Sequence, residues 1–330
     1  MNEFNLKVHL RGVRGSISSP IHPTVIDQKI VDTVKAYESA ASEGAEIEDF
    51  VNGLHRSARG GYGGCTACTE IVSKNGSRVI IDAGSGLKNV ATSLMSTDLG
   101  KGCGEAHIFL THFHWDHLVG LPFFIPIFIP GNKIHIYAVQ DTVNTFLDHL
   151  FCKPFFPLEK KDLGAEIILH QLEPRKSYEV DDIKLTPYQL DHPDPCWGYR
   201  VEAYGSSYAH CVDTECTRMS KAELGEDLPL YEEADLLLFD AQYSLQEVTN
   251  RINWGHSASS IGMDIAVREK VKRIIFVHHD PYAPDTALKD QEKKCLKYYK
   301  LLKKQADRHG ESFHELEWEY GHEGLEIELG

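Results

Sequence analysis

The sequence has no hydrophobic run long enough to cross a membrane. Its most apolar stretch, residues 121–129, is interrupted by Pro122 and Pro126, whereas a membrane-spanning helix needs about 20 consecutive apolar residues. The first residues also lack the charged start, apolar segment and small-residue cleavage site of a secretory signal. We therefore expect a cytoplasmic protein with no membrane partner.

Cysteine is scarce, and basic residues are outnumbered by acidic ones. Eight cysteines in 330 residues are too few for a disulfide scaffold. The chain has 34 lysines and arginines against 49 aspartates and glutamates, a formal net charge of -15. Long nucleic acids are bound through basic surfaces that release counterions. We therefore expect no long nucleic acid as a partner, and instead a small molecule or a short oligonucleotide.

Short runs of β-branched and apolar residues recur along the whole chain. They predict strands at residues 6–10, 69–73, 78–82, 106–110, 133–138, 166–172, 183–189, 197–202, 207–210, 236–240, 273–277, 314–318 and 325–329. Helical patterns lie at about residues 26–54, 87–95, 142–150, 257–269 and 285–306. Because groups of strands alternate with helices, we expect an α/β (α+β) fold with two stacked sheets and outer helices, a four-layer αββα sandwich.

The chain has no internal repeat and no low-complexity linker, so we interpret residues 1–330 as a single domain. The polar, helix-prone segment 24–59 interrupts the strand pattern and is predicted to be a helical insertion. It could be a surface helix, a lid or an element of a homodimer. The apolar, proline-rich residues 121–130 could also form a homodimer face if they are exposed.

One loop concentrates residues that bind metal ions. His112, His114, Asp116 and His117 follow the predicted strand 106–110 directly. Imidazole nitrogen and carboxylate oxygen are the usual ligands of zinc in such sites. A chance polar turn would explain any one of these histidines, but not all four residues together. The loop could turn His112 and His114 toward one ion, and Asp116 and His117 toward a second one.

Further candidate ligands follow other predicted strands. His192 comes after strand 183–189, Asp213 after strand 207–210, and His278 with His279 after strand 273–277. Each lies just beyond the C-terminal end of its strand, where loops can gather into one site.

This set of residues resembles the metallo-β-lactamase superfamily. Residues 112–117 match its H-x-H-x-D-H signature, and His192, Asp213 and His278 match its later ligands in order. The resemblance implies a binuclear site at one edge of an αββα sandwich. It would place His112, His114 and His192 on one ion, Asp116, His117 and His278 on the other, and Asp213 between them. We expect two divalent ions, with zinc favoured and manganese or iron as alternatives. His278 is preferred to His279 because it lies at the strand end.

A second motif resembles the phosphodiesterase branch of that superfamily, which includes cyclic-nucleotide phosphodiesterases and the tRNA 3′-processing endonuclease. Residues 254–259 (WGHSAS) resemble the loop whose histidine faces the phosphate, and residues 239–243 (FDAQY) resemble its acidic partner segment. The resemblance implies catalytic roles for Asp116, His256 and Asp240. Arg14, in a segment similar to this branch, could contact the substrate or form a surface salt bridge.

These features predict a metal-dependent hydrolase that cleaves cyclic nucleotides or other small phosphodiesters with a hydroxide shared by the two ions. The segment between His192 and Asp213 is too short for the protruding arm of the tRNA-processing enzymes. A lactone or thioester hydrolase with the same ions, a tRNA 3′-processing-like endonuclease and a metal-binding sensor without turnover remain as alternatives.

Overall fold

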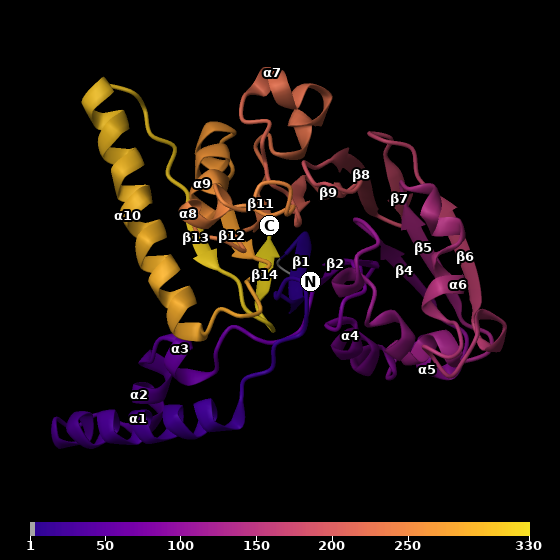
Figure 1. Cartoon of the computed structure of the whole chain (residues 1–330), viewed down its shortest axis with the longest axis horizontal. Helices are drawn as coiled ribbons and strands as arrows, with labels where there is room; N and C mark the ends of the chain where they lie inside the picture. Colours follow the sequence, from indigo (N-terminus) through magenta and orange to yellow (C-terminus); the bar gives the residue numbers. More distant parts are fainter. Residues whose placement is uncertain (1–3) are drawn as a thin grey trace.

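Two seven-stranded β-sheets packed face to face form the centre of the computed structural model, which describes residues 4–330 (Figure 1). The first sheet has the order β14-β1-β2-β3-β4-β5-β6, and the second β13-β12-β11-β10-β9-β8-β7. The strands of the first sheet are β1 (Leu6–Gly12), β2 (Cys68–Ser73), β3 (Arg78–Ile81), β4 (Glu105–Phe109), β5 (Lys133–Ala138), β6 (Glu166–Gln171) and β14 (Glu326–Leu329). Those of the second are β7 (Tyr178–Val180), β8 (Ile183–Gln189), β9 (Trp197–Ala203), β10 (Ser206–Cys211), β11 (Leu236–Asp240), β12 (Arg273–Val277) and β13 (Glu317–Tyr320).

Helices cover the outer faces of both sheets. The α-helices are α1 (Pro23–Ser42), α2 (Ile47–Gly53), α3 (Arg56–Arg59), α4 (Leu87–Leu94), α5 (Asp98–Lys101), α6 (Phe146–Leu150), α7 (Lys221–Leu224), α8 (Leu245–Val248), α9 (Ser259–Arg268) and α10 (Asp285–His309). Short 3-10 turns are η1 (Trp115–His117), η2 (Leu121–Phe123), η3 (Ile125–Phe128), η4 (Asp141–Asn144), η5 (Lys160–Asp162) and η6 (Gly225–Leu230). The predicted αββα sandwich is confirmed. Among residues 4–330, no helix is both long and apolar enough to cross a membrane.

The alternation of the strand sequences explains the layers. In β1, Leu6, Val8 and Leu10 are buried while the residues between them are partly exposed. These side chains join the core between the two sheets, together with residues such as Tyr199 and Leu238 of the second sheet. A strand with one buried face alternates in this way because successive side chains point to opposite faces.

The outer layers are held by two further apolar clusters. Leu87, Val90 and Leu94 of α4 pack on the first sheet against residues such as Ile108. On the second sheet, α9 and α10 cover the outer face. All five residues of β11 are buried because that strand is covered on both sides.

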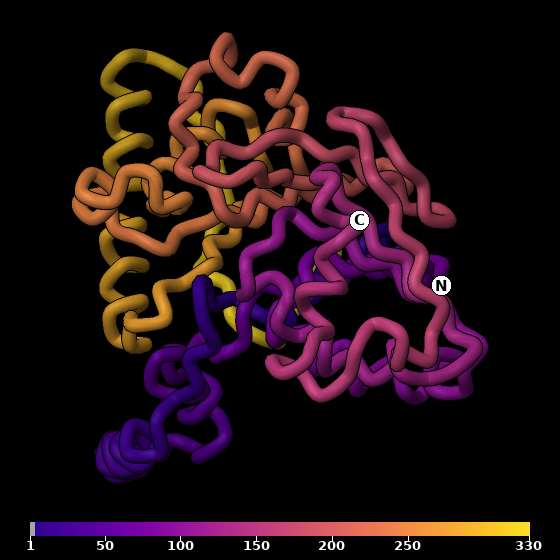
Figure 2. Tube along the Cα trace, turned by 45° about the vertical axis from the view of Figure 1, so that its right-hand side comes forward, coloured from indigo at the N-terminus to yellow at the C-terminus, as the bar shows by residue number. Residues whose placement is uncertain are grey.

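The N-terminal helices stand away from the sandwich. Helix α1 has no buried residue, and Figures 1 and 2 both show it projecting from the body. The predicted helix 26–54 is divided into α1 and α2 at Gly44, whose φ of 91° is left-handed and ends α1. That these helices are an insertion into one domain stays a prediction.

The structure differs from the sequence analysis at three other places. Strand β7 was not predicted, because its three residues are too few to show a pattern. Residues 142–150 were predicted as one helix, but they form η4 and the short α6. The predicted strand 314–318 begins only at Glu317, because the His314 ring binds the carbonyl of Val271 (2.7 Å).

The direction of the strands gathers several loops at one edge. β8 and β10 both pair antiparallel with β9, so they run parallel to each other. β11 and β12 continue in the same direction. The loops that follow these four strands therefore emerge at one edge, where they meet the loop after β4 of the first sheet.

Candidate metal centre

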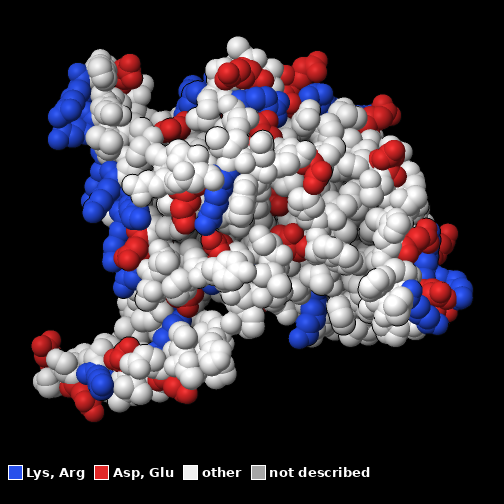
Figure 3. All heavy atoms as spheres, in the orientation of Figure 1, with Lys and Arg blue, Asp and Glu red and all other residues white. Residues whose placement is uncertain are grey.

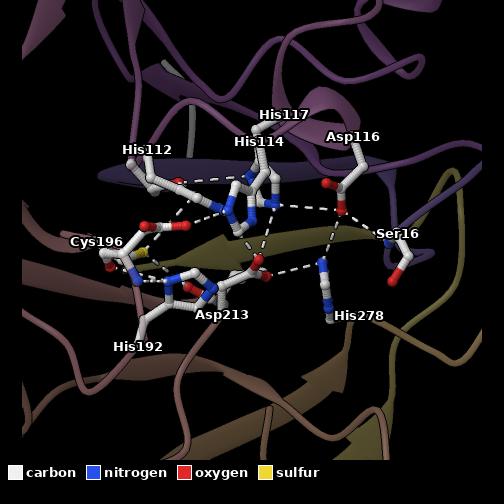
Figure 4. A network of polar contacts seen from close by, with 12 residues as sticks. Ser16, His112, His114, Asp116, His117, His192, Cys196, Asp213 and His278 are labelled. Atoms are coloured by element: carbon white, nitrogen blue, oxygen red, sulfur yellow. Dashed lines mark hydrogen bonds and ion pairs between the residues drawn. The ribbon is translucent and has the colours of Figure 1, made fainter. Parts of the chain in front are cut away.

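Seven side chains from both sheets converge at this edge (Figure 4). One group, whose ligand atoms all lie within 4.8 Å of one another, consists of His112, His114, His192 and Asp213. A second group that meets the same distance limit consists of Asp116, His117, His278 and Asp213. The structure thus brings together the seven residues that the sequence analysis named as candidate ligands, and Asp213 belongs to both groups.

Asp213 occupies the middle of the cluster. Its Oδ2 lies 3.3 Å from His112 Nε2 and 3.2 Å from His117 Nε2. Its Oδ1 lies 2.8 Å from His278 Nε2. Asp116 completes the second group, since its Oδ2 is 3.4 Å from His117 Nε2 and 3.3 Å from His278 Nε2. The nitrogen atoms therefore point at carboxylate oxygens around a small polar space.

The chemistry of these atoms fits divalent cations. His112 Nε2, His117 Nε2 and Asp213 Oδ1 are buried and make no hydrogen bond. Buried polar atoms of this kind are rare in folded proteins and need an explanation. An ion among them would supply the missing partner. The fold therefore carries a divalent-metal site formed by a histidine and aspartate cluster.

Neighbouring side chains hold the opposite ring nitrogens in place. His117 Nδ1–H donates to Asp82 Oδ2 (2.8 Å), and His112 Nδ1–H donates to the hydroxyl of Thr111 (3.1 Å). Asp82 also accepts from the Thr111 amide (2.9 Å). Partners of this type fix the tautomer of a metal-binding histidine and leave Nε2 to the ion. The contact between Asp82 and His117 was not predicted from the sequence.

Four more orienting contacts were not predicted from the sequence. Asp194 Oδ2 accepts from His114 Nε2 (2.9 Å), and the Asp194 carbonyl accepts from His192 Nδ1 (2.9 Å). Gln242 Oε1 accepts from His278 Nδ1 (2.9 Å). The amide of Ser16 donates to Asp116 Oδ2 (2.8 Å). Asp194 lies two residues after the candidate His192, and Gln242 lies two residues after the candidate Asp240. This proximity was the only feature of the sequence that pointed to them.

The buried carboxylates of the cluster make it a favourable place for a positive charge, either a proton or a metal ion. Burial, together with the neighbouring His117, lowers the pKa of His112 to about 4. For His278, burial alone lowers the pKa, but Asp213 and Asp116 outweigh it and raise the pKa to about 10. The pKa of Asp213 lies well below its ordinary value, because the charges on His278 and His117 outweigh its burial. Metal ions coordinate neutral imidazole, so their binding would release the protons that otherwise balance these carboxylates.

His278 and His279 have different environments. The ring of His278 lies within the cluster, whereas His279 Nε2 binds the carbonyl of Gly321 (2.8 Å) and its ring stacks on Tyr320. Burial lowers the pKa of His279 to about 3. The structure thus places the first histidine of the pair among the candidate ligands and the second beneath them.

His256 and Asp240 form a pair next to the cluster. His256 Nδ1 lies 2.9 Å from Asp240 Oδ2, and the His256 ring centroid is 4.9 Å from that of His278. Asp240 is fully buried at the end of β11, and its Oδ1 also accepts from the amides of Gln242 (3.0 Å) and Ser257 (3.3 Å). The carboxylate is therefore fixed, and it fixes the imidazole.

Arg14 lies under the site and not on its surface. Its guanidinium donates to the carbonyls of Gly63 (2.9 Å), Asp280 (2.9 Å) and Ala283 (3.0 Å), and only 3% of the residue is exposed. These donors are used within the chain. The sequence left open a substrate contact or a surface salt bridge. The geometry favours a structural role inside the protein, where Asp285 Oδ1 lies 3.7 Å from the guanidinium.

Comparison with known proteins agrees with this geometry. A family model described as a beta-lactamase superfamily domain matches residues 77–279, more than half of the chain. A ribonuclease Z from Azobacteroides pseudotrichonymphae is 24% identical over 268 residues, which cover 68% of this chain and 86% of the relative.

Two solved structures share the fold. The short form of human tRNase Z superposes with a TM-score of 0.58 at 16% identity, covering 98% of this chain and 99% of that one. The Zn²⁺-bound PqqB from Methylobacterium extorquens superposes with a TM-score of 0.61 at 15% identity, covering 98% of this chain and 100% of that one. With the cluster at the sheet edge, these matches show that the chain belongs to the metallo-β-lactamase superfamily, in its phosphodiesterase branch, and is a metal-dependent hydrolase.

Proposed function

We propose that this protein hydrolyses small phosphodiesters that contain a nucleotide, such as cyclic nucleotides or short oligonucleotides. The observation that carries the proposal is the His256–Asp240 pair beside the metal cluster. Hydrolysis of a lactone or thioester needs no second acid at this position. Cleavage of a phosphodiester benefits from one, because the leaving oxygen must gain a proton.

The proposal assigns the ligands as the sequence predicted. His112, His114 and His192 would hold one divalent ion, Asp116, His117 and His278 the other, and Asp213 both. When bound, two such ions polarise the phosphoryl oxygens and make a water molecule acidic enough to attack near neutral pH. Zinc is the ion favoured by this set of nitrogen and carboxylate ligands, and manganese or iron remain alternatives.

His256 supplies the proton in this proposal. Because the Asp240 carboxylate only accepts hydrogen bonds, it holds the proton of His256 on Nδ1 and leaves Nε2 for the substrate. A protonated Nε2 can donate first to a phosphoryl oxygen and then to the leaving ribose oxygen. The pair therefore positions the donor before the substrate binds, which contributes to rate through orientation.

Asp116 would orient the attacking water. The Ser16 amide holds its carboxylate from one side (2.8 Å), and 7% of the residue is exposed. A carboxylate held in this way can accept a hydrogen bond from water and direct its lone pair at phosphorus. This gives Asp116 a second role besides metal binding.

Exposed aromatic residues at the rim favour a nucleotide as part of the substrate. Trp115 lies between two candidate ligands and is 68% exposed, and Trp254 lies two residues before His256 and is 60% exposed. The Arg251 guanidinium lies over the rings of Tyr243 (4.2 Å) and Trp254 (5.6 Å). Indole rings bind nucleobases by stacking, with about 1–3 kcal/mol for each base.

One observation favours a second candidate, a tRNA 3′-processing-like endonuclease. Helix α10 carries eight lysines and arginines and only four acidic residues, and they form a blue surface along that helix in Figure 3. Such a stripe can bind the phosphates of a folded RNA. Against this candidate, β9 and β10 are joined by the short turn at Tyr204 and Gly205, with no arm between His192 and Asp213. Helices α1 and α2 project (Figure 1) but carry more acidic than basic residues.

A substrate panel tests both candidates. Protein of known metal content would be assayed on bis(p-nitrophenyl) phosphate, cyclic nucleotides, short oligonucleotides, a precursor tRNA, lactones and thioesters. A charge-reversed helix, Lys297→Glu with Lys300→Glu and Lys304→Glu, would be assayed in parallel.

We expect chelator-sensitive cleavage of the small diesters at the same rate in both proteins. Preferred cleavage of precursor tRNA that is lost on charge reversal would establish the second candidate instead. Turnover of lactones or thioesters without diester cleavage would overturn both.

A further inference from the structure

A second group of side chains of the types that bind metals lies toward the opposite ends of the strands in the first sheet. Glu105 begins β4 and His107 is the third residue of that strand, and His135 is the third residue of β5. The metal centre described above follows the ends of β4 and of strands in the second sheet. The two groups are therefore separated by the length of β4, and this one is independent of the proposed reaction.

The strand register brings the two histidines together. β4 and β5 are parallel, with His107 opposite His135 and Glu105 opposite Lys133. The two imidazole rings are stacked, with centroids 4.7 Å apart and an angle of 16° between the rings. Glu105 Oε2 lies 3.6 Å from His135 Nε2. One ligand atom from each of Glu105, His107 and His135 lies within 4.8 Å of the other two.

Both histidines have one ring nitrogen held by a neighbour. His107 Nδ1 contacts the hydroxyl of Tyr137 (3.0 Å), and His135 Nδ1 contacts His170 Nε2 (3.0 Å). This is the arrangement found around metal-binding histidines, whose second nitrogen is fixed by an outer partner while the first binds the ion. Both Nε2 atoms are thereby left for a common ligand.

His135 Nε2 gives independent support. It is buried and makes no hydrogen bond, although such atoms in folded proteins are nearly always paired. The carboxylate of Glu105 lies near it, with Oε2 at 3.6 Å. Burial also lowers the pKa of His107, and the neighbouring His135 lowers it further, so this ring is neutral near pH 7 and able to bind a metal.

Two of the three side chains, together with one further carboxylate, border a cavity beside the group. Glu105 and His107 border a cavity of about 420 Å³ that is also bordered by Asp181, in the turn between β7 and β8 of the second sheet. Lys133 Nζ binds Glu105 Oε1 (3.0 Å) and leaves Oε2 facing the histidines. Three protein ligands with a water molecule or a further carboxylate make the four-coordinate site that zinc prefers.

We propose that Glu105, His107 and His135 bind one divalent transition-metal ion of the zinc type. This ion would lie in the first sheet, on the side away from the metal centre. The ion joins β4 to β5, and Asp181 lies where it can extend the site to the second sheet. Because two of the ligands are imidazoles, the site selects zinc, cobalt, nickel or copper over magnesium and calcium.

Metal counting tests the proposal without depending on activity. The whole protein is stripped with a chelator and titrated with Co²⁺ and with Zn²⁺, and bound ions per chain are counted. The variant is His107→Gln with His135→Gln. The control is His149→Gln with His309→Gln, which changes two exposed histidines that lie outside both clusters.

We expect the parent and the control to bind one ion more per chain than the variant. All three should cleave diesters equally. Equal ion counts in all three proteins would overturn the proposal.

Two further measurements remain decisive if the double variant does not fold. Glu105→Gln changes a half-exposed side chain, and should weaken the extra ion by more than the roughly 10–100-fold that loss of an outer partner causes. Crystals of the unaltered protein grown with zinc should show an anomalous peak beside Glu105, His107 and His135. Unchanged affinity in Glu105→Gln, or no peak at this position, would refute the site.

Discussion

At the scale of single residues, the histidines of the metal centre divide their two ring nitrogens between two tasks. His117 and His278 each present Nε2 to carboxylates of the cluster, while Nδ1 is held by Asp82 and Gln242 respectively. A neutral imidazole donates from one nitrogen and accepts at the other, so each outer partner determines which nitrogen can bind a cation. His256 follows the same logic through Asp240, but its free nitrogen is available to substrate.

His256→Ala should reduce turnover without removing metal. General acid catalysis contributes about 10²–10⁴-fold, so we expect kcat on a small diester to fall by that factor. The metal content per chain should stay unchanged, because all seven candidate ligands remain. Steady-state kinetics and metal counting of the same preparation would check this.

The matched control is His149→Ala, which removes an exposed histidine far along the chain from the site. Its kinetics should equal those of the parent. If the metal content of His256→Ala fell in parallel with its activity, His256 would be a ligand and not the proton donor.

Asp227 is predicted to stabilise the fold in a pH-dependent way. It is buried and accepts from Arg175 (2.9 Å), Arg218 (2.7 Å) and the Gln189 amide (3.0 Å). Burial by itself raises the pKa of Asp227, but these hydrogen bonds outweigh it and lower the pKa below the ordinary value. Asp227→Asn should lower the free energy of unfolding at pH 7 by about 1–3 kcal/mol.

The sign of the pH effect follows from the lowered pKa. The contribution of Asp227 is fully present above the unfolded-state pKa of about 3.9 and is lost as pH falls through the lower folded-state pKa. Urea unfolding of the parent and of Asp227→Asn at pH 7 and near pH 3 would measure it. A stability difference that did not shrink in acid would contradict the assignment.

At the scale of elements, the loop before α9 depends on a glycine for its close approach to the metal centre. Gly255 has a φ of 84°, and an added Cβ would lie 2.3 Å from the His192 ring. The Gly255 amide also donates to Glu215 Oε1 (3.0 Å). A side chain here would push His192 and His256 apart, so the loop that carries the proton donor is held against a candidate ligand by the absence of a side chain.

Gly255→Ala should therefore displace residues of the metal centre in addition to straining the backbone. Gly310→Ala is the control, because Gly310 has a φ of 70° but no atom within 4 Å of an added Cβ. Both variants should lose about 1–2 kcal/mol for a left-handed alanine. Only Gly255→Ala should lose metal affinity and turnover, which calorimetry and kinetics would show. Equal activity of the two variants would contradict this account of the loop.

At the scale of the whole molecule, the metal centre connects the two sheets. The ligands after β4 belong to the first sheet, and those after β8, β10 and β12 belong to the second. Anything that binds the folded state alone stabilises it by mass action. Ions in this cluster would therefore stabilise the packing of one sheet on the other as well as the reaction.

Chelation should lower the midpoint of thermal unfolding, and re-addition of zinc should restore it. Asp213→Asn removes the carboxylate shared by both groups, so its midpoint should respond much less to the chelator. Differential scanning calorimetry of both proteins, with and without chelator, is the measurement. An identical response of Asp213→Asn and the parent would show that the stabilising ion binds elsewhere.

The homodimer expected from the sequence stays a prediction, and α1 offers a way to test it. Ile26, Ile30 and Val34 lie one helical turn apart and are exposed. Ile26→Glu with Ile30→Glu should convert a dimer into a monomer in light scattering at matched concentration, while Gln28→Glu on another face should not. A mass that is unchanged by the double substitution would exclude α1 as the contact.

The sequence alone determined the fold class and the composition of the cluster. The alternation in β1 and the apolar runs of β11 and β12 predict strands, because the spacing of side chains along a strand is local. The spacing within residues 112–117 likewise indicates metal ligands, since a short loop keeps them near one another. His192, Asp213 and His278 could be named because each follows a predicted strand.

Only the tertiary structure decided which distant groups meet. The pairing of Asp82 with His117, of Gln242 with His278 and of Asp194 with His114 joins segments whose separation in sequence carries no signal of contact. The same holds for His107 and His135, which are neighbours only through the parallel register of β4 and β5. The burial of Arg14 was also beyond the sequence, because an arginine on the surface and one bound to three backbone carbonyls look alike until the chain is folded.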